Sequence, residues 1–316
     1  MPFTLSHAVA VLPAMRADGT GRAALLVPSV MVAGSFAPDM TYYAASALPG
    51  AMVFGDVTHS FAGVLTVDVA IAWLLVGAWL LLREPLVALL PRRVRGRAAV
   101  LTRCGTPRSR PRPRLAAAWY LSAVLGSLTH VVWDAFTHLD RWGMRVFPVL
   151  GEEIAGSPLY WYLQYGGSAV AAVVIVWFLV RALRRSVPHG GDGFSGGDGF
   201  SGDDGFSGGD GFVGGAAGLP ELSRRDRWAA GALLALCAGF AATTRVMRWW
   251  AYWGHIARPW EIIPTLCFGA GAGLVVGLLL YGTAVRVWRR PPRGPRAEAG
   301  ETEARGAAGS RAAAPR

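Results

Sequence analysis

The chain is too apolar for an ordinary soluble protein. Of its 316 residues, 53% are hydrophobic and 16% are charged, and the mean hydropathy is +0.36. Soluble domains carry about 25% charged residues. The formal net charge of +11 comes from arginine alone. Because the arginines flank apolar blocks, they indicate membrane topology and contact with anionic lipid, and they argue against nucleic acid as a partner. The composition predicts an all-α, polytopic membrane helix bundle.

The N-terminal region contains an apolar block that is too short to cross a bilayer. The sequence opens without the basic segment of a cleaved signal peptide. The block 24–36 contains Pro28 and is shorter than the roughly 20 residues that span a hydrocarbon core. We therefore expect a half-helix, or a hairpin of residues 5–15 and 24–36 that dips into the outer leaflet.

Longer apolar blocks predict five membrane spans. They cover residues 62–82, 115–137, 167–183, 228–244 and 263–285. If all five cross, the arginine-rich segments 83–114 and 184–227 and the tail beyond residue 285 lie on one side. Arginine-rich loops of membrane proteins face the cytoplasm. The sequence thus predicts a bacterial inner-membrane protein with a cytoplasmic C-terminus, and it places segments 37–61, 138–166 and 245–262 outside.

A low-complexity segment separates the third span from the fourth. Residues 190–212 repeat the unit DGFSG every six residues, which does not match the nine-residue period of calcium-binding β-helix repeats. A flexible cytoplasmic linker fits better. The expected organisation is a membrane region at 1–183, a linker at 184–227, C-terminal membrane helices at 228–288 and a disordered tail at 289–316.

Ionisable residues in the apolar sequence are the strongest sign of a functional site. His130, Asp134 and His138 are spaced i, i+4, i+8, which places them on one face of a helix. His7, Asp39 and His59 occupy short polar interruptions elsewhere. Such groups are costly in a membrane and usually mark a site. The alternative is a polar helix end at the lipid–water interface with hydrogen-bonded histidines. We favour that interpretation for a single histidine, and a metal site for this set.

The residue types of this set indicate a metal. Imidazole and carboxylate ligands suit zinc, manganese or iron. The three cysteines, Cys104, Cys237 and Cys267, are far apart and supply no thiolate site. Asp134 lies between two histidines and could bridge two ions about 3.5–4 Å apart. We expect one or two divalent ions, with zinc as the first choice.

The same residues resemble a known family. MPFTLSH, Ala37-Pro38-Asp39, Thr58-His59-Ser60, the helix of His130 and the segment 160–164 resemble the bacterial membrane family DUF4184. The order of histidines and aspartates is also similar to YdjM-type (DUF457) membrane-bound metal-dependent hydrolases, and more distantly to zinc-dependent phospholipase C and P1 nucleases.

This resemblance implies a ligand set. His7, Asp39, His59, His130 and Asp134 would be ligands, Asp134 would bridge, and His138 would be a further ligand or an adjacent group. The soluble enzymes also use their N-terminal residues and a later HxxxE motif. Met1-Pro2 and Glu152-Glu153 do not match these features, so one or two ions are expected rather than three.

Three functions remain open from the sequence. The leading hypothesis is a hydrolase of an ester or phosphodiester, in a lipid or envelope precursor at the outer leaflet, with Asp134 and His138 as catalytic groups. Arginines of the outer segments would hold a phosphate or simply lie at the interface: Arg141, Arg145, Arg245, Arg248 and Arg258. An ion-coupled transporter, suggested by Asp68 midway along its span, is the second hypothesis. A non-catalytic membrane scaffold is the third.

Overall fold

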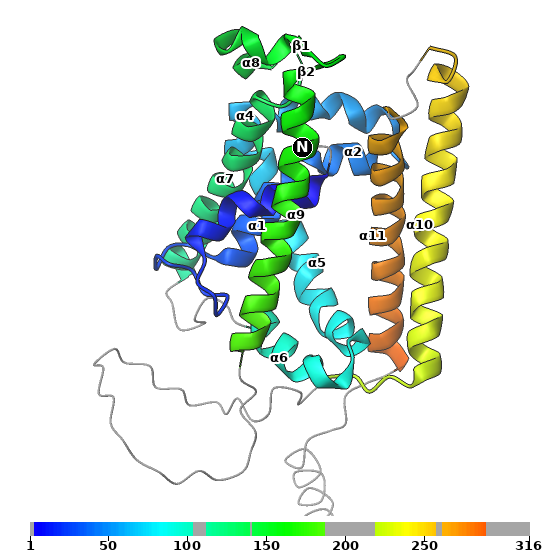
Figure 1. Cartoon of the computed structure of the whole chain (residues 1–316). Coiled ribbons are helices and arrows are strands. Elements are labelled where there is room, and N and C mark those ends of the chain that lie inside the picture. Colours follow the sequence, from blue (N-terminus) through cyan, green and yellow to red (C-terminus); the bar gives the residue numbers. More distant parts are fainter. Residues whose placement is uncertain (1–2, 104–111, 140, 187–218, 257–260, 289–316) are drawn as a thin grey trace, which may run out of the picture.

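Five long helices form the body of the protein. The computed structural model describes residues 3–103, 112–139, 141–186, 219–256 and 261–288. Within these residues, five helices are long and apolar enough to cross a membrane. They are α5 (Val67–Leu89), α7 (Arg112–Ala135), α9 (Leu159–Arg185), α10 (Arg224–Trp253) and α11 (Ile262–Trp288). They alternate in direction (Figure 1). The prediction of a five-span helical bundle is confirmed, while the repeats at 190–212 and the tail at 289–316 lie outside the described residues.

The spans are longer than the apolar blocks and reach into arginine-rich sequence. A helix keeps its backbone hydrogen bonds through the interfacial region, and arginine side chains can extend from it to water. Helix α10 starts at Arg224, where Ser223 and Asp226 form a reciprocal capping box. The predicted span 62–82 is divided between two helices. Phe61–Leu65 forms a separate helix, α4, and the chain bends at Thr66 before α5 begins.

Short helices and one small hairpin connect the spans. Between α1 (Pro28–Phe36) and α5 lie η2 (Ala37–Asp39), α2 (Met40–Ala44), η3 (Pro49–Phe54), α3 (Gly55–Thr58) and α4. Helix α6 (Arg92–Arg103) follows α5 and lies across the arginine-rich end of the bundle (Figure 1). At the opposite end lie α8 (Trp142–Val146), η4 (Pro148–Gly151) and the antiparallel pair β1 (Glu153–Ile154) and β2 (Ser157–Pro158).

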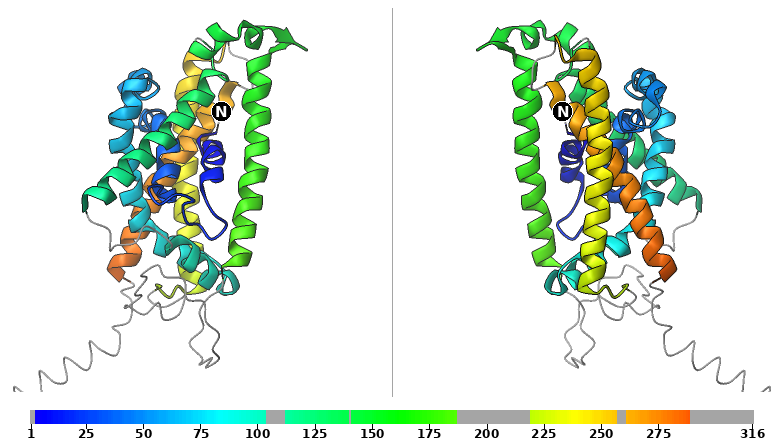
Figure 2. Two further views of the ribbon diagram at one scale, coloured as in Figure 1. Left: turned by 90° about the vertical axis from the view of Figure 1, so that its left-hand side faces the viewer. Right: turned by 90° about the vertical axis from the view of Figure 1, so that its right-hand side faces the viewer.

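The N-terminal segment folds into the bundle as two short helices. They are η1 (Thr4–Ala14) and α1 (Pro28–Phe36), and neither is long enough to cross. Pro28 starts α1 instead of interrupting it, since proline is well suited to the first turn of a helix. Helix η1 lies between α9 and the rest of the bundle (Figure 2). The prediction of a short N-terminal helix is confirmed.

Helices α1 and α7 cross at backbone contact. A Cβ at Gly126 would overlap the carbonyl oxygen of Met31, and one at Gly34 would overlap that of Ala123. The Ser127 hydroxyl also donates to the Gly34 carbonyl at 3.0 Å. Small residues permit this approach in membrane helices. The crossing brings the C-terminal end of α1 against the C-terminal half of α7, where His130 lies.

Helices α10 and α11 form a second close pair. Gly269, Gly273 and Gly277 recur every four residues on α11 and face α10, and a Cβ at Gly273 would overlap the Cys237 carbonyl. This GxxxG spacing is typical of tightly packed membrane helices. At the arginine-rich end of the bundle, α11 is tied to α5, because the Tyr281 hydroxyl donates to the Pro85 carbonyl at 2.8 Å.

Candidate metal centre

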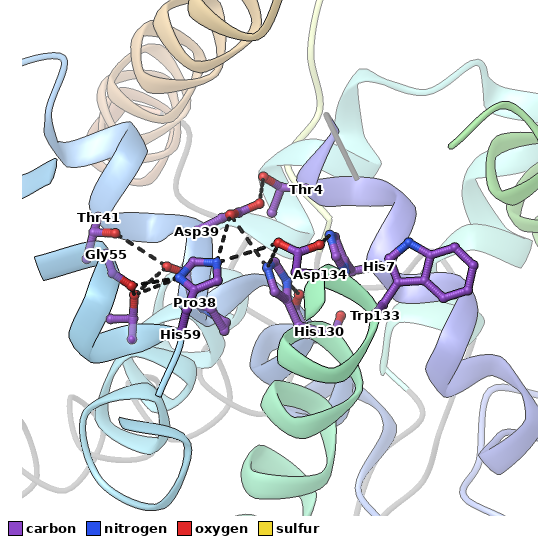
Figure 3. A network of polar contacts seen from close by, with 12 residues as sticks. Thr4, His7, Pro38, Asp39, Thr41, Gly55, His59, His130, Trp133 and Asp134 are labelled. Atoms are coloured by element: carbon purple, nitrogen blue, oxygen red, sulfur yellow. Dashed lines mark hydrogen bonds and ion pairs between the residues drawn. The ribbon is translucent and has the colours of Figure 1, made fainter. Parts of the chain in front are cut away.

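Four buried side chains from three segments converge beside the α1–α7 crossing. Asp39 comes from η2, His59 follows α3, and His130 and Asp134 lie one turn apart on α7. Each offers one ligand atom, and the four atoms lie within 4.8 Å of one another. Figure 3 shows these side chains turned toward a common point. This Asp-His-His-Asp group could hold a metal ion, and we call it the first subsite.

The spacing within the first subsite matches that of ligands around one ion. His130 Nε2 lies 3.3 Å from Asp134 Oδ2 and 3.5 Å from Asp39 Oδ1, and His59 Nε2 lies 3.6 and 3.7 Å from the same oxygens. Ligands bound to a tetrahedral zinc at about 2.0–2.2 Å are about 3.3–3.6 Å apart. Charge-assisted hydrogen bonds would instead be about 2.7–2.9 Å long. The geometry therefore fits a shared ion better than direct ion pairs.

Backbone carbonyls orient both histidines of the first subsite. His130 Nδ1 lies 2.7 Å from the Ser35 carbonyl oxygen, and His59 Nδ1 lies 2.9 Å from that of Gly55. A carbonyl only accepts, so each Nδ1 carries a proton, and each Nε2 faces the cluster, where it could bind a metal ion. His130 Nε2 is buried and has no hydrogen-bond partner among the described residues. This orientation, with Nδ1 on a carbonyl and Nε2 toward the cluster, is the one that metal-binding histidines adopt.

Asp39 is held by two further contacts. The Thr4 hydroxyl donates to Asp39 Oδ2 at 2.5 Å, which leaves Oδ1 facing the histidines. The Thr58 hydroxyl donates to the Pro38 carbonyl at 2.8 Å and ties η2 to α3, next to His59. Threonines of two separate segments thus fix the direction of one carboxylate.

The second oxygen of Asp134 faces another pair of histidines. Asp134 Oδ1 lies 3.4 Å from His7 Nε2 and 3.5 Å from His138 Nδ1. We call Asp134 Oδ1, His7 and His138 the second subsite. The His7 and His130 rings are stacked, with centroids 3.6 Å apart, so the two subsites are adjacent. Asp134 is placed to bridge them.

His7 and His138 differ in environment. Burial, and next the proximity of His130, lowers the pKa of His7 well below its usual value, so its imidazole is neutral. His7 Nε2 has no hydrogen-bond partner among the described residues, as expected of a ligand. The His138 side chain is 36% exposed, and the Gln164 amide nitrogen lies 2.9 Å from its Nε2. In this orientation Gln164 donates, so His138 Nδ1 carries a proton directed at Asp134.

All six residues predicted as ligands lie in this cluster. Helix α7 ends at Ala135, and the turn that follows keeps His138 on the side of Asp134. The chain turns there, and the His138 amide still donates to the Asp134 carbonyl at 3.1 Å. Glu152 and Glu153 are exposed at the β-hairpin and take no part.

The predicted phosphate-binding arginines separate into two groups. Arg245 donates to the Tyr42 carbonyl at 2.6 Å and to Ser46 Oγ at 2.7 Å, and Arg248 donates to the Ser46 carbonyl at 2.9 Å. These two arginines attach α10 to α2. The side chains of Arg141 and Arg145 form no hydrogen bond or ion pair within the described part of the chain, and Arg141 is close enough to Tyr42 to act on it electrostatically. Arg258 lies outside the described residues.

Asp68 does not lie midway along its span as expected. Because α5 begins at Val67, Asp68 is in the first turn of the helix. It is completely buried, and neither carboxylate oxygen has a hydrogen-bond partner among the described residues. The residue thus lies at the same end of the bundle as the cluster and not at the centre of a transport path.

Sequence reasoning missed the groups that orient the ligands. Thr4 and Gln164 contact Asp39 and His138, and the Ser35 and Gly55 carbonyls bind the two histidines. Gln164 gave a usable signal, since it is a polar residue near the start of an apolar helix. The carbonyls gave none, because every residue has one.

The fold and the cluster define a class: a polytopic α-helical membrane protein with a buried histidine–aspartate group near one end of its bundle. Within that class, the family described as "Domain of unknown function (DUF4184)" matches residues 1–283. The chain belongs to this family. No curated protein and no solved structure matches the chain.

Proposed function

We propose that the protein is a membrane-embedded, metal-dependent hydrolase with one or two divalent ions, zinc first among them. The observation that carries this proposal is the position of Asp134, whose two oxygens face two separate histidine pairs. A bridging carboxylate is typical of two-metal hydrolytic sites. The likeness in residue order to YdjM-type hydrolases and to zinc-dependent phospholipase C supports the same chemistry.

The roles of the residues follow from their accessibility. Asp39, His59 and His130 are buried and would hold the first ion, while His7 and Asp134 would contact the second. A bound zinc ion lowers the pKa of its water to about 7 and so supplies a nucleophile. His138 is the most exposed member of the cluster and lies beside Asp134, so it would exchange protons with the water and the leaving group during hydrolysis.

The substrate would be an ester or phosphodiester of a membrane lipid or a lipid-linked envelope precursor. Arg141 precedes α8 beside the site and is not engaged by other described side chains, so it would bind a phosphate. The arginine-rich ends of the spans gather at the opposite end of the bundle (Figure 1). We place that end in the cytoplasm of a bacterial inner membrane and the cluster toward the outer leaflet.

The other two hypotheses have less support. A transporter needs a polar path through the bundle, and Asp68 lies at the end of α5, not at its middle. A scaffold needs no cluster of six histidines and aspartates, five of them buried, which would be costly to maintain in a membrane.

The test is metal-dependent turnover by the purified full-length protein. Protein stripped with a chelator and reloaded with Zn²⁺ or Mn²⁺ is assayed on phospholipids, on a short-chain ester and on bis(p-nitrophenyl) phosphate. We expect hydrolysis that needs the metal and is lost in His130→Ala. His255→Ala, which changes an exposed histidine outside the cluster, serves as the control. Metal-loaded wild-type protein that cleaves none of these substrates, or His130→Ala with full activity, would contradict the proposal.

A further inference from the structure

Two apolar cavities flank Trp133 between α7 and α9. The first has a volume of about 230 Å³ and is lined by Val9, Trp133, Gly167, Val170 and Ala171, with His7 at one side. The second has a volume of about 320 Å³ and is lined by Trp133, Phe136, Phe147 and Leu163, among others. Trp133 lines both, so the two cavities lie against the same side chain of α7, and together we call them the Trp133 cleft.

The Trp133 cleft reaches the metal centre. His7 lines the first cavity, and its Nε2 is 3.4 Å from Asp134 Oδ1 of the second subsite. The Trp133 ring lies on the His7 side of the cluster (Figure 3). In the second cavity the lining includes Thr137, which precedes His138. A molecule in the first cavity would therefore touch His7, one of the histidines that face Asp134.

The other side of the cleft opens toward lipid. Val170 lines the cleft and is 65% exposed, and Val173 and Val176 continue the same exposed apolar surface along α9. Helix α9 packs against η1, α6 and η4, and it is set apart from the other spans (Figure 2). In a bilayer, the acyl chains around α9 would therefore contact the rim of the cleft at Val170.

We propose that the Trp133 cleft binds an acyl chain of the lipid substrate and holds its ester or phosphodiester against His7, His138 and Asp134. This inference rests on the proposed function. The lining of the cleft favours an apolar ligand. Besides the imidazole of His7, the cleft has one side-chain hydroxyl, that of Thr137. This hydroxyl already donates to the Trp133 carbonyl at 3.2 Å. A peptide would leave its backbone groups unpaired there, whereas an acyl chain has none to satisfy.

Gly167 determines how much room the cleft offers. It lies on α9 opposite Trp133, and a large side chain at this position would fill the first cavity. Its neighbour Gly166 is exposed, and a Cβ there meets nothing within 4 Å. Gly167→Phe and Gly166→Phe thus form a matched pair, in which the same change enters the cleft or points away from it.

Photo-crosslinking tests the cleft without relying on turnover. The full-length protein in nanodiscs is irradiated with a phosphatidylcholine or phosphatidylglycerol probe that carries a diazirine near the middle of one acyl chain, and labelled peptides are mapped by mass spectrometry. We expect labelling of the peptides around Trp133 and Val170 to exceed labelling around Phe240, which is 75% exposed on α10 and serves as the reference for random lipid contact. Gly167→Phe should reduce the ratio to that of random contact, and Gly166→Phe should leave it unchanged.

The outcomes distinguish the proposed acyl-chain site from the proposed hydrolase activity. Equal labelling at the cleft and at Phe240, or an unchanged ratio in Gly167→Phe, overturns the acyl-chain site even if hydrolysis is observed. Selective labelling without any turnover keeps the site and removes the hydrolase. If Gly167→Phe does not fold, Val170→Trp narrows the cleft from its exposed rim and has the same expected effect. For an active enzyme, either variant should slow cleavage of long-chain lipids and spare the short-chain ester.

Discussion

At the scale of single residues, the centre depends on groups that direct the ligands as much as on the ligands. Two histidines donate through Nδ1 to backbone carbonyls, and Thr4 donates to one oxygen of Asp39. Such contacts fix the ligand atoms before an ion binds. The candidate ligands could be chosen from the sequence, because histidine and aspartate stand out in apolar segments. Their partners could not, because they are ordinary residues placed by tertiary contact.

Thr4→Val tests the role of the hydroxyl on Asp39. Valine keeps the shape of the buried side chain and removes the donor, so Asp39 Oδ2 loses its 2.5 Å hydrogen bond. We expect zinc affinity to fall about 10–100-fold, as it does when a contact behind a metal ligand is lost. Competition against a fluorescent chelator measures this. Thr4→Ser should restore most of the affinity, and wild-type affinity in Thr4→Val would refute this role.

At the scale of elements, the α1–α7 crossing builds the first subsite. The crossing places the Ser35 carbonyl against His130, and it depends on Gly34 and Gly126. The sequence predicted a short N-terminal helix but not its partner. Alanine and glycine are frequent throughout these apolar blocks, so composition does not indicate which glycines lie at a helix contact. The break at Thr66 was missed for a similar reason, since both sides of it are equally apolar.

Gly126→Ala should separate α1 from α7. The added Cβ would overlap the Met31 carbonyl, which is backbone and cannot move aside alone. Overpacking of this kind costs about 1–3 kcal/mol, and here it also lengthens the His130–Ser35 hydrogen bond. We expect a lower midpoint of thermal unfolding and weaker zinc binding.

Gly77→Ala is the control for this prediction. Gly77 lies in α5 with nothing within 4 Å of an added Cβ, so the same change should leave both measurements unaltered. Equal behaviour of the two variants would show that the close crossing is not required.

At the scale of the whole molecule, the fold follows from hydropathy and charge. Five apolar blocks predicted five long helices, and the arginine-rich segments lie at one common end. The length and the mean hydropathy of a segment can be read directly from its own residues, so the spans could be predicted from the sequence. The connecting segment 37–61 was expected to face outward and to carry Asp39 and His59. Its fold was not predicted: it forms short helices between α1 and α5, which bring both residues to α7.

Cysteine labelling tests the proposed orientation. In a variant that lacks the three native cysteines, Ile154→Cys at the exposed hairpin should react with an impermeant maleimide in intact spheroplasts. Arg97→Cys on α6, at the arginine-rich end, should react only after lysis. The reversed pattern would place the cluster on the cytoplasmic side and contradict the outer-leaflet assignment.

The central claim is that Asp134 holds metal between two histidine pairs, and the metal content of the purified protein tests it most directly. The full-length protein, purified without chelators and measured by inductively coupled plasma mass spectrometry, is expected to contain one or two zinc ions or an equivalent amount of another divalent metal. Asp134→Asn should contain none above the buffer level, while Asp56→Asn, at an exposed aspartate of α3, should match the wild type. Wild-type protein free of metal, or Asp134→Asn with full occupancy, would contradict the account.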